Sequence, residues 1–161
     1  MGKLVVVEGD PVRGTDTHNV SGMTSSSPPV AYTGVGDYQY TGSVTDALSD
    51  FVTIGGVPVA LVSSKSSLDP GQTAPPAGGH SGPAGSNFAP PAPAPNPVTL
   101  SIVDSPLGTG VPNAGAGSGV LTVGGVKVLL DSDKIDTCSG IGVTADSTVT
   151  AQGQSFVTCS Q

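Results

Sequence analysis

Two segments far apart in the chain are nearly identical strand–glycine–glycine–strand units. Residues 52–59 read VTIGGVPV and residues 121–128 read LTVGGVKV. In both, β-branched residues alternate around a two-residue Gly-Gly connection, which is a pattern suited to a tight β-hairpin. We therefore predict two β-hairpins, at Val52–Val59 and at Leu121–Val128, and a chain built by repetition of short strands and turns.

The rest of the sequence also favours strands. Helical periodicity is nearly absent, and only Thr45–Val52, with Thr45 as its N-cap, could form one or two helical turns. The predicted fold class is therefore all-β, with long Gly/Pro-rich loops and at most one short helix. Further short strands are expected at Leu4–Val7, Val98–Val103, Ser147–Gln152 and Ser155–Cys159.

The length of 161 residues suits a single domain, 1–161. Within it, Ala89–Pro97 alternates proline with small residues, so we expect an extended segment that crosses a face of the domain. Residues 64–97 as a whole are predicted to form a long irregular loop, and the sequence leaves open whether that loop is ordered or mobile.

Charge excludes two classes of partner. Only 11% of the residues are charged, the net charge is −7, and the five basic residues are scattered singly. Nucleic acid is not an expected partner, because neutralising phosphates requires clustered Lys and Arg. An amphipathic helix on an anionic membrane is excluded for the same reason. The apolar run Leu4–Val7 is too short for a signal-peptide core or a membrane span, so neither is expected.

The residues able to bind a soft metal are four: His18, His80, Cys138 and Cys159. Two imidazoles and two thiolates are a complete tetrahedral shell for zinc, and a closed shell of this kind is structural. Their spacing is not that of a zinc finger. Two alternatives stay open: a disulfide between Cys138 and Cys159, or four unrelated residues.

A short repeat bears on this metal hypothesis, because residues 16–18 read DTH and residues 136–138 read DTC. If His18 and Cys138 lie at equivalent ends of equivalent β-units, Asp16 and Asp136 would support the metal ligands from outside the shell. The alternative is that both aspartates form Asx-turns.

Enzyme motifs are broken in this chain. GHSGP, residues 79–83, has Pro83 where a nucleophile elbow needs its second glycine. The acidic group Asp131, Asp133 and Asp136 lacks the loop pattern of a calcium site. We expect a protein that is not an enzyme; the alternative is a secreted hydrolase that uses His80 and Ser81.

Three stretches carry a family resemblance: VVVEGDPVRGTDTH at the start, GGHSGPAGSNF in the middle and VLLDSDKIDTCSG near the end. They resemble PAAR and PAAR-like proteins, the sharpened tips of contractile injection systems. The resemblance implies a β-rich cone that caps a trimeric spike, with a metal ion held near the apex by His and Cys. His18 would match the first PAAR loop, and His80, Cys138 and Cys159 would complete the site. Many PAAR tips have three His and one Cys, whereas this chain has two of each; the implied metal is zinc, with iron less favoured.

The function expected from this resemblance is a structural one. The chain would be the membrane-piercing tip of a contractile injection particle, one copy per particle, stiffened by a metal ion and assembled in the bacterial cytoplasm before the particle is retained or released. Its partners would be the trimeric spike, transiently the target membrane, and effectors. The recurring strand–turn units are expected to offer three similar faces to the trimer. The alternative is a stand-alone, metal-stabilised β-domain acting as an adhesin or binding module.

Overall fold

A computed structural model describes residues 2–69, 81–91, 97–104, 108–137 and 147–160, with the backbone alone described at 81–84 and 97–99. The described residues form these strands: β1 (Lys3–Leu4), β2 (Pro11–Thr24), β3 (Ala31–Asp46), β4 (Thr53–Ile54), β5 (Val57–Pro58), β6 (Lys65–Leu68), β7 (Ser81–Ala89), β8 (Pro97–Ile102), β9 (Thr109–Pro112), β10 (Thr122–Val123), β11 (Val126–Lys127), β12 (Lys134–Thr137), β13 (Ser147–Val149) and β14 (Thr158–Cys159).

The predicted all-β class is confirmed for the described residues, which contain no helix. The short helix considered at Thr45–Val52 does not form, because β3 continues to Asp46 and Ala47 then takes a positive φ of 53°. It follows that these residues supply no helix able to cross a membrane.

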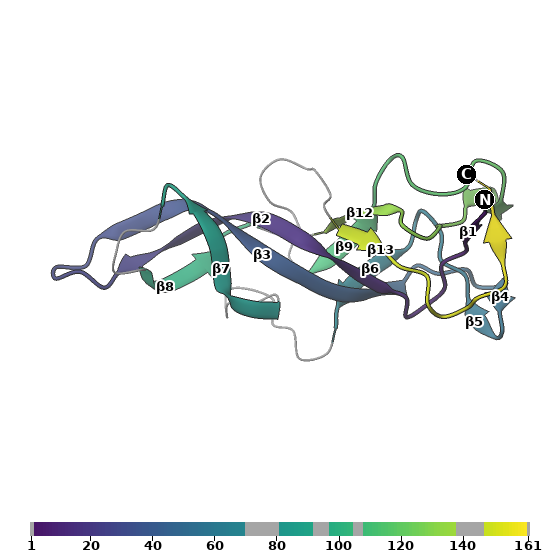
Figure 1. The fold of residues 1–161 in the computed structure, drawn as a ribbon, viewed down its shortest axis with the longest axis horizontal. Helices are drawn as coiled ribbons and strands as arrows, with labels where there is room; N and C mark the ends of the chain where they lie inside the picture. Colours follow the sequence, from purple (N-terminus) through teal and green to yellow (C-terminus); the bar gives the residue numbers. More distant parts are fainter. Residues whose placement is uncertain (1, 70–80, 92–96, 105–107, 138–146, 161) are drawn as a thin grey trace.

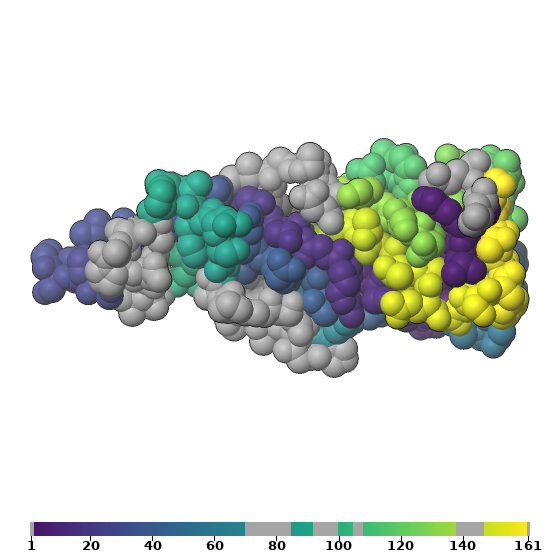
Figure 2. Space-filling view, in the orientation of Figure 1, coloured from purple at the N-terminus to yellow at the C-terminus, as the bar shows by residue number. Residues whose placement is uncertain are grey.

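The molecule is elongated and tapers from a broad end to a narrow one (Figures 1 and 2). Both chain termini lie at the broad end, which we call the base. The narrow end is the connection between β2 and β3, residues 25–30. Because β2 and β3 pair along thirteen consecutive positions, one long hairpin runs most of the length of the molecule.

The base is organised around three short segments that bridge one another in a closed ring. Their central residues make a cycle of backbone hydrogen bonds: Val6 N–H donates to Leu129 O (3.0 Å), Leu129 N–H to Ala60 O (3.0 Å), and Ala60 N–H to Val6 O (2.9 Å). Each segment thus gives one bond and receives one, as three copies around a threefold axis would. We call the segments the base ring; they are Val5–Val7, Val59–Leu61 and Val128–Leu130.

The same threefold relationship governs the chain on either side of the base ring. After each ring segment the chain turns and runs outward as a strand, and a second strand later brings it back. The outward and returning pairs are β2 with β3, β6 with β9, and β12 with β13. Antiparallel pairing joins these six strands in the order β3-β6-β9-β12-β13-β2, and β2 pairs again with β3, so they close into a small barrel.

Both predicted Gly-Gly hairpins are confirmed and occupy equivalent places at the base. β4 pairs with β5 around Gly55-Gly56, and β10 pairs with β11 around Gly124-Gly125. The glycines take positive φ values of 60–86°, which glycine adopts without the strain of a Cβ. The third place is filled by β1 and β14, in which the two ends of the chain pair where the other units have a turn.

The core has two layers, separated by the base ring. The central ring residues Val6, Ala60 and Leu129 pack into the barrel, with Tyr40 and Ile135 among their neighbours. The flanking ring residues pack the opposite way, into a cluster at the base. This alternation is what a strand buried on both faces requires, and it explains why the ring segments read as continuous apolar runs.

Beyond the barrel, the outer parts of β2 and β3 form a shaft. β7 flanks β3 there, and β8 flanks β2 from Val20 to Thr24. A separate apolar cluster of Val20, Tyr32, Tyr38 and Ile102 fills it. Most of the predicted extended segment Ala89–Pro97 lies outside the described residues; β8 confirms the strand predicted at Val98–Val103.

Candidate functional site

His18 lies on β2 where the barrel gives way to the shaft, and its side chain is 0% exposed. The imidazole and the Tyr38 ring pack in an edge-type arrangement, with ring centroids 5.8 Å apart. Two carboxylates flank it: Nδ1 lies 3.1 Å from Asp104 Oδ2, and Nε2 lies 4.0 Å from Asp16 Oδ2. His18 is therefore an interior residue of a narrow polar layer, set between two acids.

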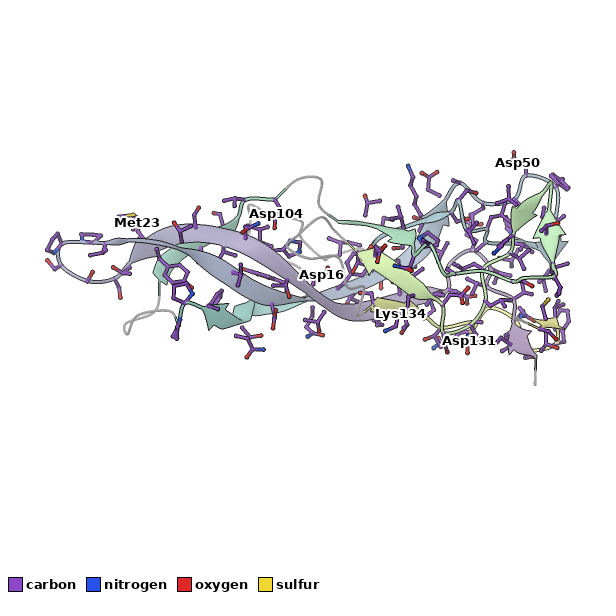
Figure 3. All side chains as sticks on the ribbon, turned by 90° about the horizontal axis from the view of Figure 1, so that it is seen from above. Asp16, Met23, Asp50, Asp104, Asp131 and Lys134 are labelled. Atoms are coloured by element: carbon purple, nitrogen blue, oxygen red, sulfur yellow. The ribbon has the colours of Figure 1, made fainter. Side chains whose placement is uncertain are left out.

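Asp104 holds this layer to the end of β8. Its Oδ2 accepts the backbone N–H of Asn19 at 2.8 Å, and its Oδ1 accepts the Asn19 side-chain amide at 2.8 Å. Together with His18, these contacts fix the segment after β8 to the middle of β2. Figure 3 shows Asp104 between the barrel and the narrow end, with Asp16 further toward the base.

Asp16 belongs to a buried network of hydroxyl groups inside the barrel. Thr137 donates its hydroxyl hydrogen bond to Asp16 Oδ1, and the hydroxyls of Thr137 and Ser147 lie 2.7 Å apart. The two DT dipeptides that are repeated in the sequence thus lie close together, Asp16 from one and Thr137 from the other.

Although the two DT dipeptides lie close together, they do not occupy equivalent positions in the threefold register of the units. In the threefold register, Asp10 matches Asp133, because each closes the turn after a ring segment in the same way. Asp136 then matches Arg13, not Asp16. Asp16 and Asp136, which were expected to be equivalent, are therefore three residues out of register, and Cys138 lies outside the described residues. Asp136 instead accepts hydrogen bonds from the side-chain amide of Asn113, at 3.2 Å to each carboxylate oxygen.

Cys159 lies at the base, in β14, where it pairs with Lys3. Its thiol is free and lies 3.1 Å from the hydroxyl of Ser118, and the residue packs against the apolar cluster of the base. The threefold register explains this environment, because Cys159 stands where the other two units have Ile54 and Val123.

The structure therefore separates the two described members of the predicted zinc site. His18 lies six strand residues beyond Val12, roughly 20 Å at the usual rise. Val12 belongs to the barrel cluster, whereas Cys159 packs against the base cluster on the other side of the base ring. Zinc ligands lie about 2.0–2.3 Å from the ion, so one ion cannot bind both side chains. Among the described residues, no three His, Cys, Asp or Glu side chains form a group able to hold a metal. His80 and Cys138 lie outside the described residues.

The acidic residues near the base have structural partners. Asp133 Oδ2 accepts the backbone N–H of Leu130 and of Gly117, both at 2.8 Å. Asp131 Oδ1 accepts the N–H of Ala151 at 2.8 Å. These carboxylates satisfy backbone amides at turns.

A third copy of the repeated strand motif escaped the sequence reasoning. The segments FVTI (51–54), VLTV (120–123) and FVTC (156–159) occupy the same place in the three units. Only the first two are followed by Gly-Gly, so the third copy lacks the turn signal by which the hairpins were predicted. The shared pattern of two apolar residues, Thr and a third apolar residue was the signal that could have revealed it.

The first residue of each copy is an exposed apolar side chain. Phe51 is 73% exposed, Val120 is 71% exposed and Phe156 is 69% exposed. Large apolar residues with this exposure, at three equivalent places, mark a contact surface more clearly than one scattered residue would. We call Phe51, Val120 and Phe156 the rim residues.

The shaft differs from the base in charge. Neither Thr17–Gly36 nor Pro70–Val103 contains an Asp, Glu, Lys or Arg residue. These ranges include the outer parts of β2 and β3, all of β7 and the described strand β8. Asp37 and Asp104, both at the level of His18, mark the inner limit of this region, and the charged side chains of the described residues lie from there toward the base.

The chain matches no protein-family model, no curated protein and no solved structure. The two features that distinguish the molecule are the threefold base and the uncharged shaft.

Proposed function

We propose that this chain is the structural, membrane-piercing tip of a contractile injection particle. In this arrangement the base stands on a trimeric spike and the shaft points toward the target membrane. The proposal assigns no catalytic role to any residue.

The closed hydrogen-bond cycle of Val6, Ala60 and Leu129 is the observation that carries the proposal. A single chain that caps a homotrimer meets three identical surfaces, and it can satisfy them equally only by presenting three similar surfaces itself. The base does so with one polypeptide, including a third unit assembled from the two ends of the chain. An isolated binding module has no need of such internal symmetry.

The uncharged shaft supports the piercing role. Each charged side chain carried to the centre of a bilayer costs about 2.5–3.5 kcal/mol even on permissive scales, whereas Ser, Thr and Gly cost less. Residues 17–36, which include the narrow end, are rich in Ser, Thr and Gly and contain no Asp, Glu, Lys or Arg residue. Stiffness there comes from the continuous pairing of β2 with β3, from the flanking strands, and from the attachment of Asp104 to His18 and Asn19.

The predicted zinc ion stays a prediction. None of the contacts just named involves Cys159, and the proposal requires no ion bound between the shaft and the base. A metal held by His18 with residues outside the described ranges would add stiffness at the polar layer, and its presence is a matter for elemental analysis.

Particle purification tests the proposal. An affinity-tagged chain is expected to co-purify with a sheath-and-tube particle at about one copy per particle, visible as density beyond the spike. Particles from a deletion strain should assemble but lose their effect on target cells. Recovery of the chain only as a free protein, with particles unchanged by its deletion, would overturn the proposal.

A matched pair of charge variants tests the piercing role separately. Val30 is exposed near the narrow end, and Val111 is exposed on β9 of the barrel. Val30→Lys should leave particle assembly intact and reduce target-cell killing, whereas Val111→Lys should change neither. Equal activity of both variants would show that an uncharged shaft is not required.

A further inference from the structure

The rim residues are fixed by the same local structure in all three units. Ser49 Oγ accepts the backbone N–H of Phe51 (3.4 Å), Ser118 Oγ accepts that of Val120 (3.1 Å), and Gln154 Oε1 accepts that of Phe156 (3.0 Å). The three acceptors are buried and also bind the next residue of their unit. Although the acceptor differs between units, the backbone that presents each rim residue is held in the same way.

The rim residues lie at the base, around the threefold ring. The phenyl ring of Phe51 reaches the turn of the next unit, since a Cβ placed on Gly124 would lie 3.7 Å from its Cζ. Figure 3 places Asp50, the chain neighbour of Phe51, at the broad end. Each rim residue is therefore on the part of the molecule that the proposed function turns toward the spike.

From these observations we infer that the rim residues are three anchors, each inserting into one of three identical apolar recesses on a homotrimeric partner. The inference rests on the proposed function and adds to it the chemistry and symmetry of the contact. The occupant is a homotrimer rather than an asymmetric protein, because only a threefold partner offers the same surface to three equivalent, outward-facing apolar residues. Exposed phenylalanine is also the kind of side chain that interfaces favour as anchors.

The composition of the rim allows a direct test of the threefold symmetry of the partner. Two rim residues are Phe and one is Val, so identical recesses must accept either side chain. Around the ring the order is Phe51, Val120, Phe156. Exchanging the first two residues, in Phe51→Val with Val120→Phe, gives the order Val, Phe, Phe, which is the wild-type order rotated by one unit. A threefold partner cannot distinguish the two arrangements, whereas an asymmetric partner can.

The experiment measures binding of purified variants to the trimeric spike protein of the contractile particle made by the same organism. Phe51→Val is expected to weaken binding about tenfold, because a smaller apolar area is buried. Val120→Phe is expected to strengthen it by a similar factor. The double variant Phe51→Val/Val120→Phe should bind within about twofold of the wild type. Val111→Ala, at an exposed apolar residue off the rim, is the control and should have no effect.

The outcomes separate this inference from the proposed function. A wild-type chain that does not bind the trimer refutes the proposed function and the inference with it. If the wild type binds but the double variant stays as weak as Phe51→Val, the recesses are not equivalent and the inference fails while the proposed function stands. Sedimentation of each variant alone completes the test, since rim-dependent self-association would mean that the occupant is a second copy of this chain.

Discussion

Asp10 and Asp133 make the same hydrogen bond in two different units of the base: each carboxylate lies 2.8 Å from the backbone nitrogen three residues earlier, in Val7 and Leu130 respectively. In the remaining unit Ser64 takes this role, with its hydroxyl oxygen 2.8 Å from the nitrogen of Leu61. One turn geometry is thus held by two kinds of acceptor, which shows that the backbone of the unit, more than the identity of the side chain, is what the three copies share.

Asp10 is expected to be essential for the stability of the base. Besides Val7, it accepts the backbone N–H of Gln152 (2.8 Å) and of Gly153 (2.7 Å) through Oδ1, so it ties the first unit to the returning chain. Asp10→Ala leaves three amides without an acceptor in a buried place and should lower the free energy of unfolding by about 3–5 kcal/mol. Urea denaturation monitored by circular dichroism measures this change.

The control for Asp10 is Glu8→Ala, which removes an exposed carboxylate two residues away. Its effect should stay within about 0.5 kcal/mol, as for most surface substitutions. Equal destabilisation by Glu8→Ala and Asp10→Ala would mean that net charge, and not the three amides, sets the stability of this turn.

Local sequence patterns predicted the all-β class, the two Gly-Gly hairpins and the repetition of strand–turn units. They did not predict the long hairpin of β2 and β3, and the expectation of an irregular loop at 64–97 is wrong where β6 and β7 form. The hairpins at Gly55-Gly56 and Gly124-Gly125 were predictable because a two-residue glycine turn carries its own signal. The third strand pair, β1 with β14, was not predictable, since Lys3 and Cys159 stand near opposite ends of the chain and no turn joins them. Pairing between distant segments depends on tertiary contacts that periodicity cannot encode.

The DTH and DTC repeat shows the reverse case, because here a local pattern suggested that Asp16 and Asp136 are equivalent and the fold does not make them so. DTH and DTC differ by one residue and invited alignment, yet the turn closed by Asp10 and Asp133 sets a register in which Asp136 matches Arg13. The separation of His18 from Cys159 follows from the fold as well. Residue type alone carries no information about the level of the molecule at which each side chain lies.

Tyr38 is expected to make stability depend on alkaline pH. Its hydroxyl is desolvated by burial in the shaft, which raises its pKa above the ordinary value of about 10. Between the ordinary and the raised pKa, the unfolded chain loses the proton that the folded chain keeps. The stabilisation is therefore complete below pH 10 and falls as the pH rises through the raised pKa of the folded protein.

Two measurements check the role of Tyr38. Ultraviolet titration of tyrosinate in the folded protein should show a late phase that Tyr38→Phe removes. The free energy of unfolding of the wild type should also fall more steeply above pH 10 than that of Tyr38→Phe. Identical alkaline profiles for the two proteins would show that burial of this hydroxyl is not what resists ionisation.

Cys159 is expected to be dispensable for any zinc that the chain binds. Its sulfur lies at the base, beside Ser118 and away from the level of His18. Elemental analysis of the purified chain should therefore give the same zinc content for the wild type and for Cys159→Ser, a substitution that retains a polar group beside Ser118. Loss of zinc in Cys159→Ser would contradict the placement described above, and a wild type free of metal would show that the zinc prediction itself is wrong.

The pairing of β1 with β14 predicts that the chain can be circularly permuted. Lys3 faces Cys159 as Val57 faces Ile54, so joining Ser160 directly to Gly2 leaves a two-residue connection of the same length as Gly55-Gly56. New ends opened between Gly124 and Gly125 would then move the gap to another unit. Because the three strand pairs at the base, β4–β5, β10–β11 and β1–β14, are equivalent, this permutant should fold with a melting temperature within a few degrees of the wild type.

The matched control for this permutation places the new ends inside the base ring, between Ala60 and Leu61. There Ala60 and Leu129 share a hydrogen bond of the threefold cycle, so the cut removes covalent continuity from a fully paired, buried segment. This second permutant should be largely unfolded by circular dichroism under conditions in which the first is native. Similar stability of the two permutants would show that the base ring is not the unit on which the fold depends, and that the resemblance among its three segments has no bearing on folding.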